Sequence, residues 1–246
     1  MKIGDYVTRN KYKNDIVFII YDITSEGLYK LKGEDVRLLA DSFANDLSIY
    51  EKEERIIDEE QNSINQVPAN IVMGKVLHID GDQRYLQKSL NLYKKYDIPV
   101  VAYYLNEEEI KNQITNLLIK HKPDILVITG HDAYKENSDT EEFKNSKNFV
   151  DAVKKARIYQ PDKDALVIFA GACQSNYEAL IESGANFASS PGRVSINVLD
   201  PVKIAIEVAK TNVRSFLDIE EILNKTTNKN QGIGGIDTRG VARKIY

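Results

Sequence analysis

The amino-acid sequence predicts a two-part protein, in which a small β-rich module precedes an α/β domain with one parallel sheet. Three observations predict this fold. Residues 1 to about 50 contain short β-branched and aromatic runs separated by glycines. From residue 71 onward, apolar runs of strand length alternate with amphipathic stretches of helical period. Two of the apolar runs, 124–129 and 165–170, are apolar almost throughout, as strands buried on both faces should be.

The N-terminal module, residues 1–50, is expected to form a small barrel of the SH3-like type. Its strand candidates are 6–8, 15–22, 28–31 and 36–39. Four or five short strands with tight turns at Gly27 and Gly33 suit such a barrel. Two interpretations of this module stay open, a purely structural appendage and a docking or specificity module. Residues 51–68 are charged and then polar, and we interpret them as a partly helical linker.

The second domain, residues 69–225, is predicted from the order of its elements. Strands are expected at 71–79, 98–105, 124–129, 165–170 and 186–190. Helices are expected at 83–95, 107–121, 149–159, 176–183, 201–210 and 219–225. This alternation demands a parallel sheet with right-handed crossovers and helices on both faces. Residues 226–246 are interpreted as a C-terminal tail, either flexible or packed as an arm.

The composition favours a folded, soluble, intracellular protein. Hydrophobic residues make up 42% and charged residues 28% of the chain, close to globular averages, so a core can be buried. The formal net charge of −4, with both signs interspersed, gives no basis for a nucleic-acid partner. No apolar run approaches the ~20 residues that span a bilayer, and no apolar secretory segment follows Met1. The single cysteine fits a reducing compartment.

Chemically reactive side chains follow two of the predicted strands. The run 124–129 is followed by Gly130 and His131, and the run 165–170 by Gly171 and then Cys173. Since parallel strands gather their carboxyl ends at one edge, His131 and Cys173 face the same crevice if the strands are neighbours. An imidazole can take the thiol proton, and the glycines let backbone N–H groups approach a substrate oxygen. The sequence therefore predicts a cysteine endopeptidase with Cys173 as nucleophile and His131 as general base.

The cysteine and the histidines also have structural interpretations. A lone cysteine is commonly a small buried hydrophobe, and a non-catalytic flavodoxin-like binding or scaffold domain is the alternative function. His78 lies within an expected strand and His121 ends an expected helix, so both are interpreted as structural. The sequence lacks paired Cys or His spacings for a metal. Gly232 to Gly235 follow no predicted strand, so they do not form a phosphate-binding loop. We therefore expect neither a metal nor a nucleotide cofactor.

The order of the two residues along the chain separates two classes of cysteine enzyme. Amidotransferase-like hydrolases place the histidine after the cysteine, whereas no histidine follows His131 here. A histidine that precedes the cysteine by 42 residues (173 − 131) resembles the caspase, legumain and gingipain clan, where caspases show ~50. That resemblance implies a parallel sheet with helices on both faces and a Cys/His dyad. The clan usually has glycine after the histidine. Here Asp132 stands there, and its backbone N–H and that of Cys173 are the expected oxyanion donors.

Three segments resemble the YabG family of sporulation-specific cysteine proteases. They are residues 3–9 (IGDYVTR), 129–133 (TGHDA) and 171–177 (GACQSNY), and the similarity continues to 237–240 (DTRG). This resemblance implies a protease of the sporulating cell, acting in its cytoplasm or at the spore coat. It also implies spore coat and germination proteins as substrates, with a preference for arginine before the cut. The oligomeric state is left open.

An arginine preference would require an acidic pocket for that side chain. Asp132 and Asp200 are the candidate carboxylates, because both follow strand ends of the predicted sheet. Gly130, Ser189 and Ser190 are expected to edge the substrate groove, by analogy with the place where this clan builds its pocket.

Overall fold

The computed structural model describes residues 1–51, 70–137 and 140–246. The predicted linker, 51–68, lies outside the described residues except for its first position. The chain divides into two compact units, Met1–Gln66 and Val67–Tyr246, and each is described by itself.

The first unit is a five-stranded antiparallel sheet with strand order β4-β3-β2-β1-β5. The strands are β1 (Tyr6–Arg9), β2 (Phe18–Ile23), β3 (Leu28–Gly33), β4 (Leu39–Phe43) and β5 (Leu47–Ile49), with 3-10 turns at Asn10–Tyr12 and Ala44–Asp46. Its small core consists of Val7, Phe18, Ile20, Leu31 and Leu47. The fourth strand begins at Leu39, where the expected strand 36–39 ends, because the chain turns back over residues 33–38. The closed SH3-like barrel stays a prediction.

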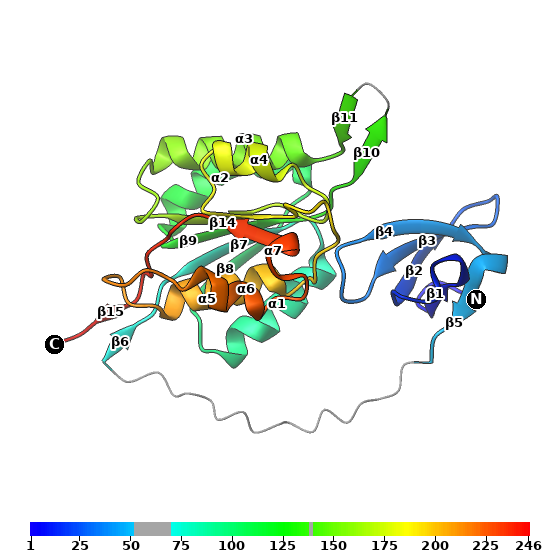
Figure 1. Ribbon diagram of the computed structural model, residues 1–246, viewed down its shortest axis with the longest axis horizontal. Helices are drawn as coiled ribbons and strands as arrows, with labels where there is room; N and C mark the ends of the chain where they lie inside the picture. Colours follow the sequence, from blue (N-terminus) through cyan, green and yellow to red (C-terminus); the bar gives the residue numbers. More distant parts are fainter. Residues whose placement is uncertain (52–69, 138–139) are drawn as a thin grey trace. The chain divides into compact units, whose positions relative to one another are not determined.

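The second unit is built on a six-stranded sheet with strand order β14-β13-β12-β9-β7-β8 (Figure 1). The strands are β7 (Val76–Asp80), β8 (Val100–Tyr104), β9 (Ile125–Thr129), β12 (Val167–Ala170), β13 (Phe187–Ser189) and β14 (Ile233–Gly235). All neighbours pair in parallel except β13 and β14, which are antiparallel. The parallel strands thus follow the doubly wound order 2-1-3-4-5, and the predicted α/β class is confirmed.

Helices cover both faces of this sheet (Figure 1). One face carries α1 (Gln83–Lys95), α5 (Asp200–Lys210) and α6 (Ile219–Asn224), and the other carries α2 (Glu107–His121), α3 (Ser146–Tyr159) and α4 (Tyr177–Glu182). Residues of β9 alternate between two cores, with Leu126 and Ile128 in one and Ile125 and Val127 in the other. This alternation explains the continuous apolar runs, because a strand buried on both faces has no polar side.

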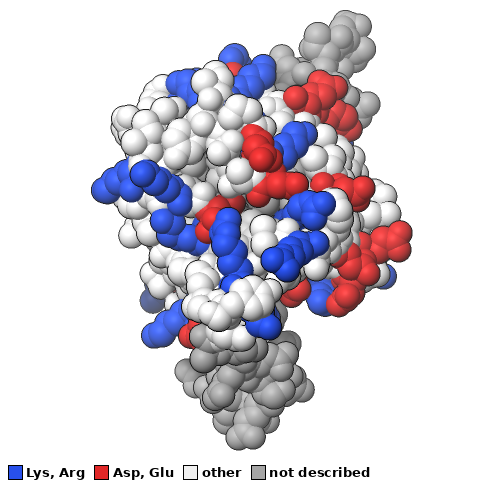
Figure 2. All heavy atoms as spheres, turned by 90° about the vertical axis from the view of Figure 1, so that its left-hand side faces the viewer, with Lys and Arg blue, Asp and Glu red and all other residues white. Residues whose placement is uncertain are grey.

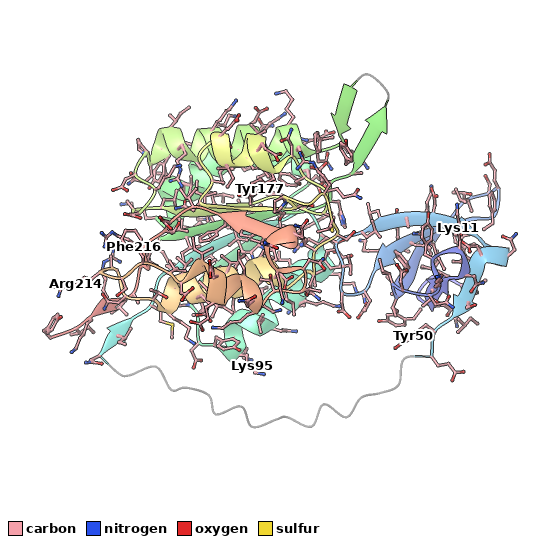
Figure 3. The ribbon with its side chains drawn as sticks, in the orientation of Figure 1. Lys11, Tyr50, Lys95, Tyr177, Arg214 and Phe216 are labelled. Atoms are coloured by element: carbon pink, nitrogen blue, oxygen red, sulfur yellow. The ribbon has the colours of Figure 1, made fainter. Side chains whose placement is uncertain are left out.

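The expected C-terminal tail contributes two short strands to the second unit. After the short helix α7 (Lys229–Gly232), β14 completes the sheet, and β15 (Arg243–Lys244) pairs with β6 (Ile71–Val72). The glycines of β14 allow close packing, since a Cβ at Gly234 would lie 2.6 Å from the hydroxyl oxygen of Tyr177, which Figure 3 labels. No strand was predicted here, because β14 spans only three residues, two of them glycine.

A β-hairpin occupies the polar stretch that follows β9. Its strands are β10 (Tyr134–Asn137) and β11 (Thr140–Phe143), and it projects beyond the helical layer in Figure 1. Lysine and arginine side chains lie beside aspartate and glutamate on the face shown in Figure 2, as the mixed charge of the sequence predicts. None of the helices in the described part of the chain is long and apolar enough to cross a membrane.

Candidate active site

His131 follows the carboxyl end of β9, and its ring is fixed by a carboxylate. Its Nε2 lies 2.9 Å from Oδ2 of Asp82, whose side chain is 3% exposed. Because an ionised carboxylate only accepts hydrogen bonds, Nε2 carries a proton, and in the neutral imidazole the lone pair therefore lies on Nδ1. Nδ1 is buried and has no hydrogen-bond partner among the described residues. The arrangement therefore leaves Nδ1 as the nitrogen that can accept a proton.

The backbone of His131 is also held on both sides. Its N–H donates to Oε1 of Glu107 over 2.7 Å, and its carbonyl accepts from the Asn145 side-chain amide over 2.8 Å. Glu107 reaches this position because Gly81 and Gly130 have no side chains. A Cβ there would lie 2.3 Å and 2.6 Å from Oε1 of Glu107, respectively. Gly130, predicted to edge the substrate groove, thus makes room for this carboxylate.

Cys173 lies at the same edge of the sheet as His131. In the β9–β12 ladder Ile128 is level with Ala170, and each of the two residues comes three positions after this pair. Gly171 turns the chain between strand and cysteine with φ of +115°, a conformation that favours glycine. The side chain of Cys173 is 1% exposed, and the backbone N–H of Ile196 donates to its sulfur over 3.1 Å. The thiol in turn donates to the carbonyl of Ile196 over 3.7 Å, so both backbone groups of Ile196 hold the side chain in place.

Asp132 was predicted to recognise substrate, but its carboxylate is used inside the fold. It is 8% exposed, and Oδ1 accepts the backbone N–H groups of Ala133 and Asn145 over 2.9 and 2.7 Å. Oδ2 accepts the hydroxyl of Ser175 over 2.9 Å and a short hydrogen bond from Ser146. These four hydrogen bonds match the ~four lone-pair sites of a carboxylate, so none is left over for an arginine of a substrate.

Asp200 and the two serines are likewise committed to partners in the fold. Asp200 is buried at the start of α5, where it pairs with Lys203 over 2.9 Å and accepts the N–H of Thr227. The hydroxyl of Ser190 donates to the carbonyl of Val194 and accepts the N–H of Gln174, so Ser190 braces the residue next to Cys173.

Ser189 is fully buried, and its hydroxyl has no hydrogen-bond partner among the described residues. The sequence placed these serines at a strand end, but it could not show which way they point.

Asp82 and Glu107 are the site residues that sequence reasoning missed. The signal for Asp82 was present, because it follows Gly81 at the end of an apolar run, just as His131 follows Gly130. Asp82 also caps α1, since its Oδ1 accepts the N–H groups of Arg84 and Tyr85. A buried carboxylate in both roles is held firmly in place.

A chain of hydrogen-bonded, buried polar side chains leads from Asp82 into the interior of the domain. Its N–H donates to Asp80, which also accepts the hydroxyl of Thr129 over 2.9 Å. Thr129 in turn lies 3.0 Å from Nε2 of His78, and Nδ1 of His78 lies 3.2 Å from the hydroxyl of Tyr93. His78 therefore belongs to the interior, as predicted. Within the described ranges, no group of three or more His, Cys, Asp or Glu side chains is arranged to hold a metal ion.

Comparisons with known proteins give the family. A family model described as YabG peptidase U57 matches residues 2–73 and 51–246. The sporulation-specific protease YabG of Bacillus subtilis (strain 168) is 41% identical over 279 residues, covering 98% of this chain and 96% of that protein. No solved structure matches the chain significantly. The chain therefore belongs to the YabG family of peptidases.

Proposed function

We propose that this protein is a cysteine endopeptidase of sporulation in which Cys173 is the nucleophile and His131 the general base. The observation that carries the proposal is the state of His131. Asp82 holds the proton on Nε2, so Nδ1 is left as an unpartnered base at the sheet edge where Cys173 lies. We add Asp82 to the predicted dyad as the residue that orients the imidazole.

The proposed reaction has two stages. Nδ1 of His131 takes the proton from the sulfur of Cys173, and the thiolate attacks the scissile carbonyl. The resulting oxyanion is held by the backbone N–H groups of Cys173 and Asp132. The protonated imidazole then gives its proton to the leaving amine, which yields an acyl-enzyme. Water, deprotonated by Nδ1, releases the acid and restores the thiol.

The finer fold assignments belong to the same proposal. The parallel strand order 2-1-3-4-5, with the histidine after the third strand and the cysteine after the fourth, supports a place in the caspase, legumain and gingipain clan. The first unit is proposed to be an SH3-like docking or specificity module. The name of the Bacillus subtilis relative supports a role in the sporulating cell, in the cytoplasm or at the spore coat. We infer spore coat and germination proteins as substrates, cut after arginine.

A labelling experiment separates this proposal from a non-catalytic scaffold. The native protein is treated with a peptidyl chloromethyl ketone that ends in arginine, and modified peptides are located by mass spectrometry. We expect selective modification of Cys173, which disappears in His131→Ala and is weaker with a glutamine reagent. Cleavage of an arginine-containing peptide should be lost in Cys173→Ala. If Cys173 reacts only after denaturation, or if Cys173→Ala still cleaves, the cysteine mechanism is wrong.

A further inference from the structure

The loops that follow β9 and β12 are joined through one buried carboxylate. We propose that Asp132 is a positioning residue, which holds His131 and Cys173 at the separation that proton transfer needs. This inference rests on the proposed function. It gives the residue next to His131 a role different from substrate recognition.

The carboxylate of Asp132 connects several segments of the chain. Its carboxylate accepts one hydrogen bond from its own loop, at Ala133, and two from the start of α3, at Asn145 and Ser146. The fourth comes from Ser175, two residues after Cys173. A single side chain therefore ties the histidine loop, the cysteine loop and a helix terminus together.

Three of these partners in turn hydrogen-bond to the backbone of His131 or of the loop that carries Cys173. Asn145 donates its side-chain amide to the carbonyl of His131 over 2.8 Å. The Ser175 oxygen accepts the N–H of Ala172, the residue before Cys173, over 2.9 Å. The Ser146 oxygen accepts the N–H of Asn176 over 2.8 Å. A single intervening side chain therefore links the Asp132 carboxylate to the main chain of the histidine loop, and another links it to the main chain of the cysteine loop.

The direction of these hydrogen bonds explains why this position needs a carboxylate. Ser146 and Ser175 each have one hydroxyl proton, and both give it to Asp132. Their oxygens are then oriented to accept backbone N–H groups. An asparagine would bring two N–H donors to a place where four donors already converge, so the direction of at least one hydroxyl would have to reverse. Charge-assisted hydrogen bonds in a buried site are also the stronger ones.

Asp132→Asn, which keeps the size of the side chain, is the main test. Activity is measured on an arginine peptide and divided by the concentration of sites titrated with the chloromethyl ketone, so that unfolded enzyme does not count. Because a displacement of about 1 Å at a reaction centre can cost ~10²-fold in rate, we expect kcat per titrated site to fall by roughly that factor. KM should change by less than about threefold, since the side chain of Asp132, which alone is altered, makes its four hydrogen bonds within the fold.

A second readout reports the dyad without substrate. The rate at which iodoacetamide alkylates Cys173 is measured against pH in the native protein. An imidazole beside the thiol favours the thiolate, so the wild-type protein should react below the ordinary thiol pKa of about 8.5. In Asp132→Asn the profile should move towards that value. A residue that only stabilised the fold would leave the profile of the folded protein unchanged.

Two further variants complete the design. Asp124→Asn is the matched control, because Asp124 accepts the N–H of Lys75 just before the amino end of β9, away from the dyad. It should lower the melting temperature and leave kcat per titrated site unchanged. Ser175→Ala removes the contact between the loops together with the hydrogen bond from the N–H of Ala172, and it serves if Asp132→Asn does not fold. The double variant Asp132→Asn/Ser175→Ala should be no slower than the slower single variant, since both break one connection.

The outcomes separate this inference from the proposed function. If the wild type cleaves through Cys173 but Asp132→Asn and Ser175→Ala keep the wild-type kcat and alkylation profile, Asp132 is only structural and the inference is wrong. If Cys173→Ala retains activity, the proposed function itself fails, whatever Asp132 does.

Discussion

Asp82 has two roles that one substitution can separate. In Asp82→Asn the amide oxygen can still accept the N–H groups of Arg84 and Tyr85, and asparagine is as good an N-cap as aspartate. The amide N–H would then face Nε2 of His131, where Oδ2 now lies at 2.9 Å. A donor at that point reverses the tautomer, which puts the proton on Nδ1 and removes the base.

The expected effects are therefore large on rate and small on stability. A wrong histidine tautomer costs ~10⁴-fold in kcat in a serine protease, and we expect a loss of about 10³ to 10⁴ here. The free energy of unfolding should change by less than about 1 kcal/mol in Asp82→Asn. Asp82→Ala should lose the same activity and, in addition, ~1 kcal/mol of helix capping.

Steady-state kinetics on an arginine peptide and thermal melting, measured on both variants in parallel, test this reasoning. The most informative quantity is the ratio of the shifts in melting temperature of the two variants, because only the alanine variant removes the helix cap. A kcat for Asp82→Asn within tenfold of the wild type would contradict the orienting role. An asparagine variant as unstable as the alanine variant would show that the cap and the imidazole contact cannot be separated.

Three other substitutions should mainly report stability. Arg157→Ala should cost about 2–4 kcal/mol in urea unfolding, because the guanidinium donates to the carbonyls of Gly184 and Leu166 and to the side chain of Asn186, and buried acceptors would be left unsatisfied. Gly171→Ala should lose about 1–3 kcal/mol and most of the Cys173 labelling, since φ is +115° and a Cβ would lie 2.9 Å from Leu180. Glu178→Gln should shift the melting temperature by less than Gly171→Ala. Its ion pair with Arg193 measures 2.7 Å, but the carboxylate is 58% exposed, so we expect less than about 1 kcal/mol.

The sequence predicted the strands of the α/β unit well, for a physical reason. β9 and β12 are buried on both faces, so their composition alone marks them, and the residues after them share one edge of the sheet. That logic placed His131 and Cys173 at the same edge, where both follow neighbouring parallel strands. It would have found Asp82 too, had the end of β7 been given the same weight as the ends of β9 and β12.

The role of Asp132 could not be predicted in this way. Its partners Ser146 and Ser175 lie 14 and 43 residues away along the chain, and no local pattern encodes which hydroxyl points at which carboxylate. Asp200 shows the same limit, because Lys203 is near in sequence whereas Thr227 is not. Sequence patterns predict where a strand ends, and tertiary hydrogen bonds decide what the side chains beyond it do.

The two edges of the main sheet differ in how they could meet another molecule. On one side β14 has only three residues, two of them glycine, so it is a short template for further pairing. On the other side β8 has five residues and ends at Tyr104, which is 50% exposed. Sheet extension between copies would therefore find its longer template at β8. The C-terminal strand in this way gives the sheet a short edge on one side and leaves the longer edge on the other.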